Sequence, residues 1–108
     1  MGRRRIYQHY DVPGTVASMV QAMIQDYPRR QKLIDTDGCI SEEWIRLNSV
    51  IAEVINSHEP MLSSIILSDI IQCRGYDSSK ASILASKNLY YNLKHKLIED
   101  IARKCNLI

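Results

Sequence analysis

Residues 86–98, SKNLYYNLKHKLI, carry amide, basic and aromatic side chains, and no acid occurs before Glu99. Amide side chains such as those of Asn88 and Asn92 can form paired hydrogen bonds with adenine, and lysines can reach guanine or phosphate. Carboxylates in the same stretch would repel phosphates. The segment therefore has the residue types that bind a nucleic acid, provided that they share one exposed surface.

A helix over residues 86–105 would divide these side chains between two faces, at about 100° per residue. The apolar face comprises Tyr90, Leu93, Leu97, Ile101 and Cys105, bordered by Ile98 and Ala102. The polar face comprises Asn88, Asn92, His95 and Glu99, flanked by Lys96 and Arg103 on one edge and by Tyr91 on the other. By itself this pattern suits a solvated outer face as well as a helix that enters a DNA groove.

The rest of the chain predicts the helices that would support this surface. Apolar residues from Val16 to Tyr27 recur at helical spacing, and no segment alternates as a strand would. Residues expected to cap or begin helices are Thr15, Ser41, Pro60, Asp77 or Ser78, and Ser86; Pro28 ends the first helix or opens the next, and Gly75 is expected to end a helix.

These signals predict an all-α fold of about five helices. Residues 1–14 would form a basic N-terminal arm and turn, and residues 15–108 a single helical domain. Within that domain, a short helix, a tight turn and a longer basic helix over residues 77–105 describe a helix-turn-helix.

Charge is divided unevenly along the chain, although the net charge is only +2. Residues 1–34 and residues 73–108 each carry net +4, whereas residues 35–72 carry net −6. Because acidic helices would repel DNA, we expect the central segment to face away from it and to support the core or a partner. Its apolar stripes are wide enough to suit a homodimer; packing within the monomer is the alternative.

The sequence lacks the residue patterns that calcium, zinc and catalytic sites require. A calcium loop aligned on Gly38 would need ligands where Leu33 and Trp44 stand. The three cysteines are widely separated, and no histidine has a relay partner at close spacing. We therefore predict a protein that is not an enzyme and holds no metal or cofactor. No apolar run could span a membrane and no signal segment is evident, so a cytoplasmic location is expected.

The C-terminal sequence YDSSKASILASKNLYYNLKHKLIEDIARKCNLI resembles the ArpU/RinA-type phage transcriptional regulators. The resemblance rests on Ser86, Tyr90-Tyr91, Leu93-Lys94, Ile98, Ile101-Ala102 and Leu107-Ile108, with IQDYPRRQKLI similar to a Tyr-Pro-basic helix of the same proteins. It implies a helix-turn-helix like the promoter-binding region of bacterial sigma factors. The chain departs from the family between Ala81 and Ser86, which is one residue shorter and has Ala85 in place of the usual glycine; a tighter turn or a shifted short helix is expected.

Together these observations predict a transcriptional regulator of phage or prophage type that contacts duplex DNA through its last helix. The predicted DNA-binding residues are Lys87, Asn88, Tyr91, Asn92, Lys94, His95 and Lys96, with Arg74 and Lys80 as outer phosphate contacts and Arg3, Arg4 and Arg5 as a basic arm. RNA polymerase is a candidate protein partner. The alternatives are a helical protein–protein adaptor and a small phage DNA-packaging subunit.

Overall fold

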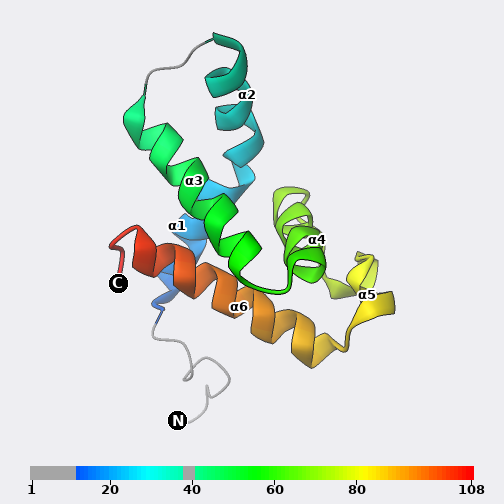
Figure 1. Cartoon of the computed structure of the whole chain (residues 1–108). Helices are drawn as coiled ribbons and strands as arrows, with labels where there is room; N and C mark the ends of the chain where they lie inside the picture. Colours follow the sequence, from blue (N-terminus) through cyan, green and yellow to red (C-terminus); the bar gives the residue numbers. More distant parts are fainter. Residues whose placement is uncertain (1–11, 38–40) are drawn as a thin grey trace.

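Figure 1 shows a computed structural model in which residues 12–37 and 41–108 are described, and every regular element in these ranges is helical. The elements are α1 (Gly14–Gln25), α2 (Tyr27–Asp37), α3 (Glu42–Ser57), α4 (Pro60–Ile71), the 3₁₀ helix η2 (Tyr76–Ser78), α5 (Ala81–Leu84) and α6 (Lys87–Lys104). The all-α prediction is confirmed. Among the described residues, none of the helices is both long and apolar enough to cross a lipid bilayer.

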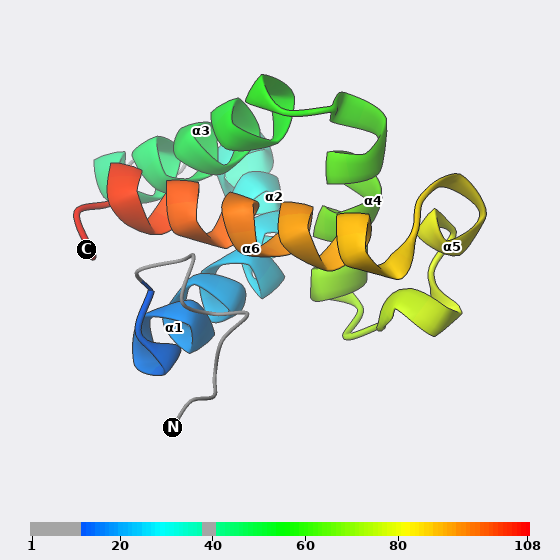
Figure 2. The ribbon, with the colours of Figure 1, turned by 90° about the horizontal axis from the view of Figure 1, so that it is seen from below.

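Helix α6 is the element on which the others assemble. It packs against α1, α3 and α4, and α3 also packs against α4. Figure 2 shows α6 crossing the front of the described structure, with its first turn at the same end as α5. The α2–α3 pair extends in another direction, toward the top of Figure 1. The N-terminal turns of α6 thus lie away from the acidic start of α3.

A mainly aliphatic core joins these helices. Its buried members are Val20, Ile24, Ile51, Val54, Ile55, Leu62, Ile66, Ile70, Ala81, Tyr90, Leu97, Ile98, Ile101 and Ala102. Full burial of a side chain as large as Leu or Ile stabilises a fold by about 1.5–3 kcal/mol. The stripes of α3 and α4 that suggested a homodimer supply much of this core, so they are used within one chain. The dimer itself stays a prediction.

Three predicted helix starts are confirmed, and each rests on local chemistry. The Ser41 hydroxyl accepts a hydrogen bond from the Trp44 amide at 3.2 Å, and Pro60 is the first residue of α4. The Ser86 hydroxyl accepts from the Leu89 amide at 3.1 Å. Each cap satisfies an amide that the helix itself leaves unpaired. Pro28 lies inside α2, so it opens that helix rather than ending the one before.

Two boundary predictions are wrong. Helix α1 begins at Gly14, so Thr15 lies inside the helix rather than at its cap, and the Pro13 carbonyl accepts the first helical hydrogen bond from the Ala17 amide at 2.9 Å. Helix α4 ends at Ile71 rather than at Gly75. There the chain reverses at Cys73, which has a positive φ of 56°. The following amide then caps the Asp69 carbonyl at 2.8 Å, so the turn needs no glycine.

The short helix before α6 is also shorter than predicted. Neither Asp77 nor Ser78 caps it, because both lie in η2. Helix α5 begins at Ala81, whose amide donates to the Ser79 hydroxyl at 2.9 Å. Ala85, which stands where the similar family has glycine, is extended with φ −151°. An alanine fits there without strain, and α5, the short helix before α6, has a single turn.

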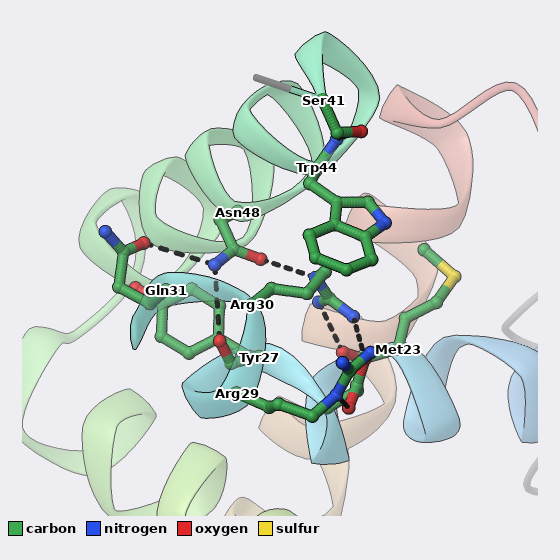
Figure 3. Close-up of polar contacts among 9 residues, drawn as sticks. Met23, Tyr27, Arg29, Arg30, Gln31, Ser41, Trp44 and Asn48 are labelled. Carbon is green, nitrogen blue, oxygen red and sulfur yellow. Dashed lines mark hydrogen bonds and ion pairs between the residues drawn. The ribbon is translucent and has the colours of Figure 1, made fainter. Parts of the chain in front are cut away.

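A buried arginine fixes the bend between α1 and α2 against α3 (Figure 3). The Arg30 side chain is only 4% exposed and donates to the Asn48 amide oxygen at 2.8 Å and to the Met23 carbonyl at 2.6 Å. The Asn48 amide nitrogen donates in turn to the Tyr27 carbonyl at 3.2 Å and to Gln31 at 3.1 Å. Burial lowers the pKa of the Arg30 guanidinium, and Asp26 at 3.3 Å opposes that effect. The network holds α2 on α3 with hydrogen bonds where α2 has few apolar side chains.

Replacing Asn48 with alanine tests this network. We expect Asn48→Ala to lower the free energy of unfolding by about 2–4 kcal/mol, because it removes the acceptor of the buried Arg30 Nε and the side-chain donor to the Tyr27 carbonyl. The exposed neighbour Ser49 provides the matched control, and Ser49→Ala should change stability by less than about 0.5 kcal/mol. Urea titrations of both variants measure the difference. Equal effects would show that the network does not hold α2 in place.

Candidate nucleic-acid interface

The outward stripe of α6 is rotated relative to the predicted one. Its exposed residues are Lys87, Asn88, Leu89, Asn92, Lys96, Arg103 and Lys104. Asn88, Asn92 and Lys96 therefore lie on the solvent side as expected. Leu89, which the helical wheel did not place on either face, joins them with 53% of its surface exposed.

His95 and Glu99 do not lie on this stripe. Glu99 is buried and His95 half-buried, so the prediction that they line the exposed face with the two asparagines is wrong. The reason is that α1, α3 and α4 all pack on α6 and widen its buried sector beyond a single stripe. The Glu99 carboxylate accepts a hydrogen bond from Arg103 at 2.7 Å. On the core side, Tyr90, Leu97 and Ile101 are buried as predicted, and Leu93 and Cys105 pack at the edge of the core.

A buried carboxylate holds the beginning of α6 against α4. The Tyr90 hydroxyl donates to one Asp69 oxygen at 2.7 Å, and the Arg74 guanidinium contacts the other at 3.2 Å. Both residues are buried: Tyr90 is 0% exposed and Asp69 is 1% exposed. Burial, and then the neighbouring carboxylate, raises the pKa of the Tyr90 phenol far above its usual value. Arg74, a predicted outer phosphate contact, is thus engaged in an internal ion pair.

The other two tyrosines of this region anchor the turns that precede α6. The Tyr76 hydroxyl donates to the Ala85 carbonyl at 2.6 Å, and its ring meets Tyr90 edge to face at 5.3 Å between centroids. The Tyr91 hydroxyl accepts from the Tyr76 amide at 3.4 Å. Tyr91 is half-buried, and the Lys94 ammonium lies 5.7 Å above its ring. Tyr91 was predicted to contact DNA, but part of its side chain instead holds η2.

The basic residues differ in how strongly they are neutralised. Lys96 lies near Asp100 at 3.5 Å and Glu99 at 3.8 Å. Lys80 and Lys87 are exposed, and neither forms an ion pair with any residue that the structure describes. Residues 78–98 contain four lysines and no acid. Of these four, the lysines that form no ion pair among the described residues are therefore Lys80, which immediately precedes α5, and Lys87 and Lys94 in the first half of α6. The predicted arm of Arg3, Arg4 and Arg5 lies outside the described residues.

Three apolar side chains at the α5–α6 turn were missed by the sequence interpretation. Ile83 is 86% exposed, and Leu84 and Leu89 are each 53% exposed. The helical wheel contained a signal for Leu89, which falls outside the apolar stripe and on the side of Lys96. Ile83 and Leu84 gave no such signal, because a one-turn helix has no periodicity to reveal its faces.

Groups that could perform other chemistry are scattered. The described part of the chain has no cluster of three or more metal-ligating side chains. The His58 ring contacts the Asp100 carboxylate at 2.7 Å, although 42 positions separate them, and this pair ties the α3–α4 connection to α6. Cys73 and Cys105 are free thiols, and burial raises the pKa of Cys105. Cys39 lies outside the described residues.

Comparison with protein-family models, with curated proteins and with solved structures gave no match. The resemblance to the ArpU/RinA-type regulators therefore rests on the residues named above and stays a prediction.

The buried Asp69 carboxylate predicts different effects for removal of the Tyr90 and Tyr91 hydroxyls. Tyr90→Phe should lower the free energy of unfolding by about 1–3 kcal/mol, because it leaves an Asp69 oxygen buried without its donor. Tyr91→Phe removes only a 3.4 Å contact and should cost less than about 0.5 kcal/mol. Thermal or urea unfolding distinguishes the two variants. A Tyr91→Phe effect as large as that of Tyr90→Phe would contradict this assignment.

His95 makes a prediction about pH. Burial first, and the nearby Lys94 charge second, lower the pKa of His95 below 6.5. The unfolded chain then binds this proton more readily, so the His95 contribution to stability is highest above pH 6.5 and falls as the pH drops toward the folded-state pKa. His95→Gln should remove that contribution. Unfolding of both proteins between about pH 5 and 8 should show a smaller loss at low pH for the variant; parallel profiles would refute the prediction.

Proposed function

We propose that the protein is a DNA-binding transcriptional regulator of phage or prophage type that contacts duplex DNA through α6. The observation that carries the proposal is the coincidence of three properties on one surface. The first half of α6 is exposed at one end of the described structure, it presents amides outward, and residues 78–98 around it are basic without any acid. A major groove about 12 Å wide admits a helix presented in this way.

The proposed roles follow from exposure. Asn88 and Asn92 face solvent in the first two turns of α6, where they would contact base edges. Lys80, Lys87 and Lys94 would bind phosphates on both sides of the groove. Lys96 would also bind a phosphate, which would replace its contacts with Glu99 and Asp100. The more internal positions of Arg74, Tyr91 and His95 give them supporting roles.

The acidic half of the chain supports the same orientation of the protein on DNA. Glu42 and Glu43 stand in the first turn of α3, where the helix dipole favours acids, at the end of the molecule away from α5. Glu53 contacts Lys104 at 3.6 Å, on the last turn of α6. The acidic first turn of α3 therefore lies away from the proposed contact surface. We propose that this half faces solvent or a partner, including a second copy or RNA polymerase.

An adaptor that binds protein is the second candidate. The observation that favours it is the exposed apolar group of Ile83, Leu84 and Leu89, because large exposed apolar patches often mark protein interfaces. In both candidates the ligand binds the surface formed by α5 and the start of α6. The regulator would bind DNA there and the adaptor a protein, so a DNA-binding measurement distinguishes them. Sedimentation measures the oligomeric state. A ring would favour the DNA-packaging subunit, whereas a dimer would suit a regulator that binds two half-sites about 34 Å apart.

A salt titration tests DNA binding. Four lysines in contact with phosphates predict a slope of about −4 in log K against log salt for each subunit. Lys87→Ala should make that slope shallower by about 0.9. Lys32→Ala removes an equal charge from the exposed face of α2 and should leave the slope unchanged. Fluorescence anisotropy with mixed-sequence duplex provides the measurement. Absence of binding at about 50 mM salt would exclude the proposal.

A further inference from the structure

The exposed apolar side chains at the α5–α6 turn are not part of the hydrophobic core. Ile83, Leu84 and Leu89 are all absent from the buried cluster and from the residues packed on it. They fall within seven consecutive positions at the end of the molecule that also carries Lys80 and Lys87. Exposing such side chains costs free energy, so a ligand that covers them would gain affinity.

Leu89 has a defined place within this group. Its backbone amide donates to the Ser86 hydroxyl, so Leu89 stands in the first turn of α6 with its backbone fixed by the cap. Asn88, which precedes it, and Asn92, three positions later, are also exposed. An apolar group is therefore presented beside two amides on the part of α6 that would enter a groove first.

The charge around this group selects the kind of ligand. Residues 78–98 include Lys80, Lys87, Lys94 and Lys96 and no acid, which favours a polyanion over an apolar protein surface alone. The major groove of DNA presents one strongly apolar group on its base edges, the C5-methyl of thymine. Adenine, its pairing partner, presents the donor and acceptor pair that asparagine matches.

We propose that Leu89 packs against thymine methyl groups while Asn88 and Asn92 contact adenine, so that the surface recognises A·T base pairs in the major groove. This inference rests on the proposed DNA binding and adds the base composition of the site. It gives the exposure of Leu89 a use that a lysine or a serine at the same position would not supply.

Replacing thymine with uracil tests the proposal, because the change removes only the methyl group. Three duplexes of equal length serve as probes: alternating A·T, the same sequence with uracil in place of thymine, and alternating G·C. We expect the thymine duplex to bind about threefold to tenfold more tightly than the uracil duplex, since one buried methyl group changes affinity about fourfold. The G·C duplex should bind more weakly than both.

Variants at exposed positions assign the effect to Leu89. Leu89→Ala should bind the thymine and uracil duplexes equally while keeping the salt slope of the parent protein. Met61→Ala is the control, since Met61 is 62% exposed at the start of α4, and it should keep the full preference for thymine. Because both positions are exposed, we expect both variants to fold, which circular dichroism checks.

The possible failures are distinguishable. Equal binding of the parent protein to thymine and uracil duplexes, with normal salt dependence, would overturn the methyl contact and leave the apolar group to a protein partner, while DNA binding itself would stand. A thymine preference that survives Leu89→Ala would overturn the assignment to Leu89. Failure to bind any of the three duplexes would overturn the proposed function and this inference with it.

Discussion

The hydrogen bond from Tyr90 to the buried carboxylate of Asp69 is the constraint on which the proposed surface depends. A charged group this deeply buried must be paired, so Asp69 determines where Tyr90 and Arg74 lie. Tyr90 in turn sets the rotation of α6, because its ring points into the core between α4 and η2. With that rotation set, Asn88 and Asn92 face outward and His95 turns toward the protein.

The same interaction links the turn to the helix. Tyr76 packs edge to face on Tyr90 and donates to the carbonyl of Ala85, the residue that joins α5 to α6. A helix of one turn has little stability of its own, because it is too short to offset the cost of nucleation. The α5–α6 turn is therefore held by side chains from its neighbours. These contacts explain how a four-residue helix can keep a defined place before α6.

Local chemistry made part of this structure predictable from sequence, whereas packing did not. Ser41, Pro60 and Ser86 act within one turn of their own positions, and all three predictions were confirmed. Glu99 was placed on the wrong face, because the sequence does not reveal that α1, α3 and α4 all pack on α6. Asp69 was not recognised, since its partners Tyr90 and Arg74 are apparent only in three dimensions. Leu89 was missed because the sequence does not reveal that this apolar side chain remains exposed.

We propose that the end of the molecule at α5 and the first turns of α6 contacts DNA and that the opposite end, at the start of α3, does not. Amide chemical-shift mapping by nuclear magnetic resonance, during titration with a mixed-sequence duplex, tests that division most directly. We predict that the largest shifts fall between Lys80 and Lys96 and that the resonances of α2 and the start of α3 remain unchanged. Shifts centred on α2 and α3, or no shifts at all in low salt, would contradict it.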